Sequence, residues 1–484
     1  MPRLSFCQHA HFYQPPREDP FTGVIPQEIG AEPYGNFNEK ITAECYQPNA
    51  EMGNFERISF NIGPTLALWM EKFAPATLDL IVAADKKRLN AVAQVYNHTI
   101  LPLASSADKE IQIRWGITDF MRRFCRVPQG MWLAETAVDV PTLDALAKAG
   151  VAYTVLAPWQ AAGTAPRSSA EVDTTKPYVV QLPKNRSITV FFFDPNFSVA
   201  LHRTSRLTAQ QIAQEIFPMR LDNAWFGPRS GQTLFAASDG EYFGHHYPGR
   251  DALLRDLTLT EGPAAGYDPI SLNEWLDRVK PQDAIEIQNF TAWSCEHGLD
   301  RWSRDCECAR DNSVPAISGN WKGPLRAAMN RLAEHIDAVY FTQSFRWLRN
   351  AHEARLAAIE PLRGWLDWDQ FFIEQGSDDF VRAPESLRTA IHEKLRRLFL
   401  AQYYRQLMFT SCGFFFEDLS RIEPVNNIRY AAMAIKSTNM VAPEVPSFAD
   451  AFATDLAECR SVRTGQSGAE LFLREWDRAE QLLA

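Results

Sequence analysis

Short apolar runs alternate with amphipathic stretches over roughly the first 300 residues of the chain. The runs that we expect to form strands are residues 3–8, 91–96, 130–133, 152–156, 178–182, 187–193, 233–237 and 284–288. Helical patterns occupy residues 57–73, 76–88, 111–126 and 138–149. Strands that alternate with helices are typical of a parallel sheet, so the pattern predicts α/β architecture for this part.

The pattern changes from about residue 321 onward, where no run reads convincingly as a strand. Helices are expected at residues 325–338, 387–407, 427–435 and 469–483. We therefore expect a barrel-like catalytic domain over residues 1–315 and a helical region over residues 316–484. Residues 17–54 are rich in Pro, Gly, Asn and Glu, and a loop of that length is usually functional.

Composition narrows the class of protein. Hydrophobic residues make up 46% and charged residues 22%, which is ordinary for a globular chain. Lys and Arg number 49 against 59 Asp and Glu, and no basic stripe occurs, so nucleic-acid binding is not expected. No run approaches the length of a membrane span, and the N-terminus lacks a signal-peptide profile. Eight cysteines are too sparse for a disulfide scaffold, which favours a cytoplasmic protein.

Three polar clusters stand where predicted strands end, which is where parallel α/β folds build active sites. His9 and His11 lie two residues apart on a strand and point the same way, with Gln14 close behind. Glu135 follows the run that contains Trp132, near the start of a predicted helix. This carboxylate is either a nucleophile or a residue that only stabilises the helix N-terminus.

The third cluster extends from residue 238 to residue 246 and holds two carboxylates, two histidines and two aromatic residues. Asp239 and Glu135 therefore follow different strands, 104 residues apart in the sequence (239 − 135). A pair of carboxyl groups across a cleft is what glycoside cleavage requires, with one of them protonated to release the leaving oxygen. Asp194 also ends an apolar strand and is a competing candidate for the acid.

The motifs together resemble glycoside hydrolase family 57, and they occur in that family's order. They are His9-x-His11-x-Tyr13-Gln14-Pro15, Asn97-His98 with Leu101-Pro102-Leu103, Trp132-Leu133-Ala134-Glu135, and Asp239-x-Glu241-x-Phe243-Gly244-His245. The resemblance implies an incomplete (β/α)7 barrel followed by a helical region. It also implies a retaining enzyme that acts on α-glucans or malto-oligosaccharides, as an amylase, a 4-α-glucanotransferase or a branching enzyme.

Residue roles follow from the same resemblance. Glu135 matches the nucleophile and Asp239 matches the general acid/base. The residues expected to bind the sugar are His9, His11, Gln14, His98, Trp132, Glu241, Phe243, His245 and Trp293. Trp132 is as well explained by the core as by a sugar platform. No cofactor and no metal are expected, while the choice between hydrolysis and transfer and the oligomeric state stay open.

Further segments resemble an uncharacterised subgroup of the family that carries a C-terminal domain of unknown function. These segments are residues 11–18, 41–46 and 408–413. The chain departs from this subgroup in two ways. It is shorter than its usual members, and it has Ala134 where Pro commonly precedes the nucleophile.

Cys295, His297, Cys306 and Cys308 form a further group within 14 residues. Thiols and imidazoles are zinc ligands, but this spacing is not that of a standard zinc finger. We favour reduced side chains in a loop of the cleft, with zinc as the alternative.

Two rival functions remain. A metal-dependent polysaccharide deacetylase would use His9, His11 and Asp239 as ligands to activate water. A non-catalytic glucan-binding protein would keep the cleft without turnover.

Overall fold

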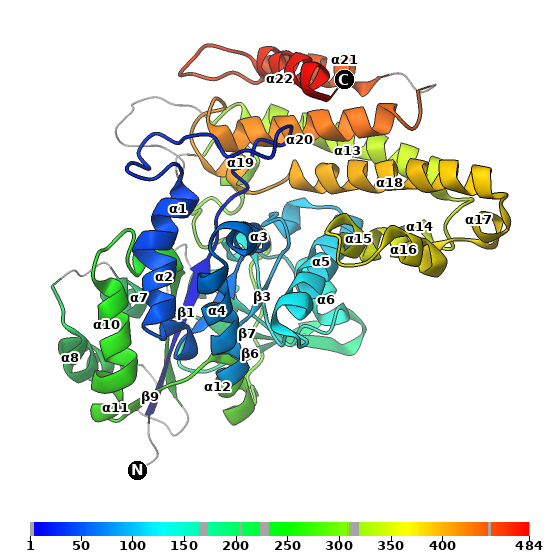
Figure 1. The fold of residues 1–484 in the computed structure, drawn as a ribbon. Helices are drawn as coiled ribbons and strands as arrows, with labels where there is room; N and C mark the ends of the chain where they lie inside the picture. The colour runs from blue at the N-terminus through cyan, green and yellow to red at the C-terminus, as the bar shows by residue number, and fades with distance from the viewer. Residues whose placement is uncertain are drawn as a thin grey trace. The chain divides into compact units, whose positions relative to one another are not determined.

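The computed structural model of the protein describes residues 4–163, 172–202, 206–222, 232–306, 308, 319–443 and 447–483 (Figure 1). The chain forms two compact units. The first comprises Met1–Gln14, Gln27–Lys109 and Asp119–Glu296, and the second comprises Pro15–Pro26, Glu110–Thr118 and His297–Ala484. The domain boundary expected after residue 315 stays a prediction, because compactness does not test whether either part folds alone.

Strand β1 is the central strand of the first unit. The strands are β1 (Leu4–Phe12), β2 (Ser59–Ile62), β3 (Ala93–Gln94), β4 (Met131–Trp132), β5 (Tyr153–Leu156), β6 (Tyr178–Leu182), β7 (Arg186–Phe192), β8 (Thr233–Asp239) and β9 (Tyr267–Pro269). β1 pairs in parallel with β2, β8 and β9. From its second residue onward β1 is buried, so its two histidines are enclosed together with its apolar side chains.

The other strands extend this parallel arrangement. β3 pairs in parallel with β4, and β5 pairs in parallel with β7. Single parallel bridges connect Phe60 with Ala91 and Gly130 with Tyr153. The expected strands at residues 178–182 and 187–193 correspond to β6 and β7, which form a hairpin in antiparallel register. The expected α/β architecture is therefore confirmed.

Helices alternate with these strands. They are α1 (Phe37–Ile41), α2 (Gln47–Glu51), α3 (Pro64–Phe73), α4 (Pro75–Arg88), α5 (Ser106–Phe124), α6 (Val140–Lys148), α7 (Pro195–His202), α8 (Ala209–Gln211), α9 (Phe217–Asp222), α10 (Arg250–Asp256), α11 (Gly262–Ala264) and α12 (Leu272–Arg278). A core that includes Trp132, Phe191, Phe235 and Trp275 joins β4, β7, β8 and α12. This core fixes the strand ends that carry the polar clusters.

The second unit is helical over residues 319–443 and 447–483, as expected. Its helices are α13 (Lys322–Ser344), α14 (Ala351–Ala357), α15 (Ile359–Leu362), α16 (Trp368–Gln375), α17 (Asp378–Arg382), α18 (Glu385–Leu407), α19 (Cys412–Phe415), α20 (Ile422–Asn439), α21 (Phe448–Asp455) and α22 (Gly468–Leu483). α18 packs along α20, and α22 packs on α20 (Figure 1). In the ranges that the structure describes, every helix is too short or too polar for a bilayer span.

Three local expectations are wrong. Residues 284–288 form only isolated bridges, Ala284 with Val179 of β6 and Ile287 with Ala161, so they build no continuous ladder. The segment 57–73 is not one helix: β2 comes first, and α3 begins at Pro64, which fits the first turn of a helix but not its interior. The expected loop 17–54 contains helical turns from residue 37 to residue 51.

Candidate active site

Glu135 sits in a tight turn directly after β4. The turn spans Ala134–Thr136, and both Glu135 (φ 57°) and Thr136 (φ 50°) have left-handed backbone conformations. Such conformations are costly for residues with a Cβ and persist where the surroundings over-determine them. Gln160 supplies that restraint, because its amide donates to the Thr136 carbonyl (2.9 Å) and accepts from the Thr136 hydroxyl (2.8 Å).

The carboxylate of Glu135 is held by two donors from one neighbouring segment. Oε2 accepts from the Ser294 hydroxyl at 2.6 Å and from the indole N–H of Trp293 at 3.0 Å. The Trp293 backbone N–H also donates to the Glu135 carbonyl (3.1 Å). Hydrogen bonds to an ionised oxygen are among the strong ones, so this arrangement stabilises a negative charge on Glu135 and fixes its direction.

Asp239 is the last residue of β8 and lies opposite His11 in the parallel register with β1. Among the described residues, no side chain donates a hydrogen bond to Asp239 in the way that Ser294 and Trp293 donate to Glu135. Burial raises the pKa of the Asp239 carboxyl well above its ordinary value, and the negative charges of Glu241 and Glu135 raise it further. The protonated form of Asp239 is therefore favoured more than that of an exposed carboxyl group, and the charge on Glu135 contributes to this effect.

The histidines of β1 form a hydrogen-bonded layer with β2. His9 is 3.2 Å from the Ser59 hydroxyl and 3.1 Å from the Asn61 carbonyl oxygen, so both of its ring nitrogens have side-chain partners. Nδ1 of His11 also meets the Asn61 amide, at 2.9 Å. Burial lowers the pKa of His9 and of His11 to about 3, and it lowers the pKa of His98 well below its ordinary value. These imidazoles are neutral hydrogen-bonding groups at pH 7.

Aromatic rings connect this histidine layer with Glu135. Trp132 stacks on His9 and His11, with ring centroids 4.8 and 5.1 Å apart, and meets Trp293 edge-on at 5.1 Å. His98 stacks between His11 (5.2 Å) and Tyr13 (3.9 Å). Trp132 is fully buried, whereas Trp293 and Tyr13 are partly exposed. Trp293 and Tyr13 therefore have surface to offer a ligand, whereas Trp132 has none.

Glu241 is buried and anchored from the N-terminal segment. Its Oε1 accepts from the Tyr46 hydroxyl (2.5 Å), from the Gln14 amide (3.4 Å) and from the Tyr13 backbone N–H (3.4 Å). Burial raises the pKa of Glu241 to about 7, against the lowering effect of these hydrogen bonds. Glu241 therefore changes charge near neutral pH, next to Asp239.

The remaining expected site residues divide into two kinds. His245 pairs with Glu44 through Nδ1 (2.5 Å) and is partly exposed. Phe243 is fully buried, and its carbonyl accepts from Asn49 (2.7 Å), so it packs beneath the turn that carries Glu241. The expected site residues thus lie at or near the ends of adjacent strands. Phe243 and Trp132, however, are fully buried.

The competing acid, Asp194, has a structural environment. Its Oδ1 accepts from the backbone N–H groups of Asn196 (2.9 Å) and Phe197 (3.1 Å) at the start of α7. Its Oδ2 accepts from Nε of Arg220 at 2.6 Å. Both carboxylate oxygens of Asp194 are thus engaged in a helix cap and an ion pair, which disfavours Asp194 as the proton donor.

Three residues that contact the site were not identified from the sequence: Asn61, Tyr46 and Ser294. Asn61 bridges the histidines, Tyr46 holds Glu241 and Ser294 holds Glu135. The sequence offers one signal for these residues: Ser294 directly follows Trp293, which is an expected sugar-binding residue. Asn61 and Tyr46 lay within segments assigned to a helix and to a loop.

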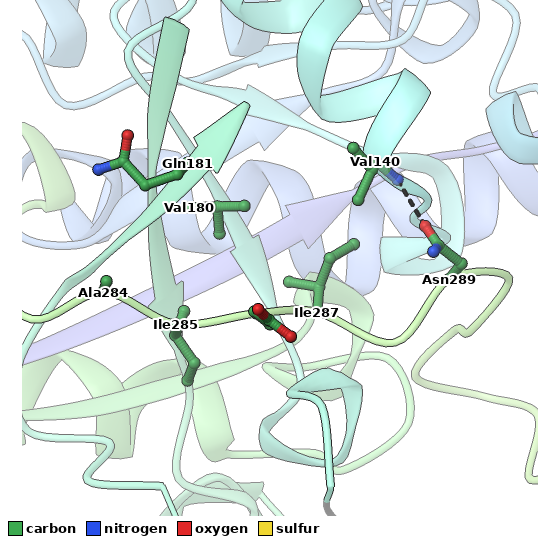
Figure 2. Close-up of a pocket in the computed structure, with 8 residues that line it drawn as sticks. Val140, Val180, Gln181, Ala284, Ile285, Ile287 and Asn289 are labelled. Atoms are coloured by element: carbon green, nitrogen blue, oxygen red, sulfur yellow. Dashed lines mark hydrogen bonds between the residues drawn. The ribbon is translucent and has the colours of Figure 1, made fainter. Parts of the chain in front are cut away.

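A separate pocket of the first unit lies beside β6. The residues that line it include Val180 and Gln181 of β6, Ile285 and Ile287 (Figure 2). At one side of the pocket the Val140 N–H donates to Asn289 Oδ1 (2.7 Å). None of the residues expected to act on a sugar lines this pocket. The candidate site is therefore defined by the strand-end carboxyl groups.

Comparison with known proteins settles the family. Residues 10–288, more than half of the chain, match the model of glycosyl hydrolase family 57. The chain belongs to glycosyl hydrolase family 57. Residues 318–479 match a domain of unknown function, DUF3536. Both parts of the resemblance inferred from the motifs are thereby confirmed, and membership places the chain among glycosidases and transglycosidases.

The relatives share the fold at low sequence identity. The exo-type maltose-forming amylase from Pyrococcus sp. ST04 superposes with a TM-score of 0.72 at 16% identity, over 98% of this chain and 88% of that one. A family 57 branching enzyme from Thermococcus kodakaraensis gives 0.56 at 13% identity, over 99% and 95%. Alpha-amylase 1 of Dictyoglomus thermophilum is 29% identical over 135 residues, which are 26% of this chain and only 19% of that protein.

Proposed function

We propose that this family 57 member is a retaining glycosidase or transglycosidase that acts on α-glucans. Glu135 is the nucleophile and Asp239 is the general acid/base. The observation that carries the proposal is the opposite treatment of the two carboxyl groups. Two donors stabilise charge on Glu135, while burial and neighbouring charges raise the pKa of Asp239.

In the first step, Glu135 attacks the anomeric carbon and forms a glycosyl ester. The protonated Asp239 transfers its proton to the departing glycosidic oxygen. In the second step, the Asp239 carboxylate removes a proton from water or from a sugar hydroxyl, and that oxygen displaces Glu135. The two inversions give net retention of configuration.

Strand order supports the (β/α)7 barrel as the frame for this chemistry. The parallel pairings and bridges connect the strands in the order β8, β1, β2, β3, β4, β5 and β7. The Asp194 N–H donates to the Phe235 carbonyl (2.7 Å), which connects the end of β7 with β8. We propose that this series closes as a seven-stranded barrel within a catalytic domain of residues 1–315, followed by the helical region 316–484.

The partly exposed aromatic rings support a sugar as the ligand. We propose that Trp293 offers a stacking face next to Glu135, and that His11, His98, Gln14, Glu241 and His245 hold sugar hydroxyls or position the groups that do. His9, Trp132 and Phe243 act through packing and hydrogen bonding beneath them. The substrate class rests on the relatives, which are an amylase, an α-amylase and a branching enzyme by name.

Both rival functions are less well supported. Both ring nitrogens of His9 already have side-chain hydrogen bonds, which disfavours it as the metal ligand that a deacetylase needs. A protein that only binds glucan would have no need of a strained turn at Glu135 or of a protonated Asp239.

Product analysis tests the proposal. The protein is incubated with pure malto-oligosaccharides, and the products are separated by size, with the Glu135→Ala variant as the control. Longer products indicate transfer, and short products indicate hydrolysis whose first-formed sugar has the α configuration by NMR. Wild-type protein that leaves every oligosaccharide intact, or first-formed products of the β configuration, would contradict it.

A further inference from the structure

The strongest feature outside the sugar chemistry is a compact group of three thiols and one imidazole. Cys295, His297, Cys306 and Cys308 each offer one ligand atom, and these four atoms all lie within 4.8 Å of one another. Sγ of Cys306 is 3.3 Å from Nδ1 of His297, and Sγ of Cys308 is 3.5 Å from the same nitrogen. Among the described residues no other set of His, Cys, Asp or Glu groups forms such a cluster.

These separations match the edges of a tetrahedral zinc site. With Zn–S near 2.3 Å and Zn–N near 2.0–2.1 Å, tetrahedral angles place sulfur and nitrogen about 3.6 Å apart and two sulfurs about 3.8 Å apart. The two sulfur–nitrogen distances of 3.3 and 3.5 Å are already close to that edge. Since no two of the four ligand atoms are more than 4.8 Å apart, movements of about 1 Å or less bring them to these edges.

The chemistry of the donors points to a thiophilic ion in place of a disulfide. None of the cysteines, all of which fall in the described part of the chain, is disulfide-bonded. Cys295 and Cys306 are buried, Cys308 is partly exposed and His297 is exposed. A dense group of three sulfurs and one imidazole supplies the Cys₃His ligand set of structural zinc sites.

Contacts outside the cluster anchor described residues next to the ligands. Gly298 (φ 73°) allows the chain to reverse directly after His297. Trp302 is fully buried, and its carbonyl accepts from Nε of Arg326 at 2.7 Å, which ties the segment to α13. The Asp305 carboxylate accepts from the Gly319 N–H (2.7 Å) immediately before Cys306. The ligand positions are thus fixed by contacts that do not depend on the ion.

We propose that Cys295, His297, Cys306 and Cys308 bind one structural Zn²⁺ ion. Four protein ligands fill the tetrahedron, so the ion has no open position for substrate or water and takes no part in catalysis. Cys295 directly follows Ser294, so the ion also restrains the backbone from which the Ser294 hydroxyl reaches Glu135. The zinc site does not depend on the proposed sugar chemistry.

Metal content provides the primary test. The full chain is expressed in zinc-supplemented medium, purified under reducing conditions without chelator, and analysed by plasma mass spectrometry. We expect about one zinc per chain. After removal of the zinc under reducing conditions, Co²⁺ is added, and we expect the d–d bands of tetrahedral cobalt together with thiolate-to-cobalt charge-transfer absorption.

Matched variants locate the ion. Cys308→Ser and His297→Gln change ligands that are not fully buried, and both should lose the zinc on dialysis and weaken the charge-transfer band. Cys412→Ser changes a partly exposed cysteine outside the cluster and should keep the zinc. Wild-type protein with no more zinc than Cys308→Ser, or with cobalt spectra that lack thiolate charge transfer, would overturn the proposal. Wild-type metal content remains decisive even if a ligand variant fails to fold.

Discussion

The ends of β4 and β8 present the same chemical group in opposite surroundings. At the end of β4, the Glu135 carboxylate receives an indole N–H and a hydroxyl within 3.0 Å. At the end of β8, Asp239 is desolvated and faces the charges of Glu241 and Glu135, so its pKa is raised. The first arrangement stabilises an anion, and the second stabilises a neutral acid.

In the proposed mechanism, this difference assigns two roles to two carboxyl groups of one fold. The strand positions alone are equivalent, because each residue follows a buried parallel strand. The roles arise from neighbours supplied by other segments, namely the 293–294 pair for Glu135 and Glu241 for Asp239. Changing either carboxyl group or either set of neighbours should therefore break the asymmetry in a distinct way.

The largest effect is expected for Glu135→Ala. Loss of the nucleophile should lower kcat on a malto-oligosaccharide by about 10⁴-fold or more, as removal of a nucleophile does in other covalent mechanisms. Added azide or formate should restore turnover with an inverted product, because the small anion attacks from the vacated position. A variant that keeps wild-type kcat would refute the assignment.

Asp239→Asn should lower kcat by about 10²–10⁴-fold, the usual contribution of a general acid. The loss in the first step should be much smaller for a glycosyl fluoride, whose leaving group needs little protonation. Azide should rescue this variant with retained configuration, the opposite of Glu135→Ala. Equal losses on both substrates would show that Asp239 is not the acid.

Ser294→Ala removes one of the two donors to Glu135 but leaves the carboxylate in place. A hydrogen bond to a charged group contributes about 1.5–3 kcal/mol, so we expect kcat to fall by roughly 10–100-fold. Thermal unfolding should match that of Ser187→Ala, which changes an exposed serine of β7. A fall in kcat that the Ser187 variant reproduces would argue against a specific role for Ser294.

The smallest effect concerns pH. Asp239 must be protonated in the first step, so activity should fall as pH rises through its raised pKa. In Glu241→Gln the neighbouring negative charge is gone, so the pKa of Asp239 drops and the high-pH limb of kcat/KM moves to lower pH. Glu286→Gln, which changes an exposed carboxylate, should leave the profile in place. A shift in the opposite direction would contradict the electrostatic account.

The sequence predicts the strand-end clusters well because a parallel sheet brings the carboxyl ends of its strands together. Glu135, Asp239, His9 and His11 could be identified for that reason. The neighbours that set their roles could not, because the contact between Ser294 and Glu135 joins residues 159 positions apart. Such contacts depend on tertiary packing, which local patterns do not encode.

The errors in the fold have the same origin. The pattern over residues 57–73 predicts a helix where β2 lies. The reason is that the polar residues of β2, Ser59 and Asn61, face the histidines of β1 and not solvent. That inward polarity hides the pattern of a buried strand. Residues 284–288 have the composition of a strand, but they pair with β6 and with Ala161 only through single bridges. The burial of Trp132 could not be predicted either, because it depends on packing against distant residues such as His9 and Trp293.

Trapping the covalent intermediate tests the central claim most directly. The Asp239→Asn variant is mixed with an activated fluorinated glucosyl fluoride, digested with a protease and analysed by mass spectrometry. We predict one added fluoroglucosyl mass on the peptide that contains Glu135, localised to that side chain by fragmentation, because only the anomeric fluoride leaves. A glycosyl ester on any other carboxyl group would contradict the proposed division of roles between the ends of β4 and β8.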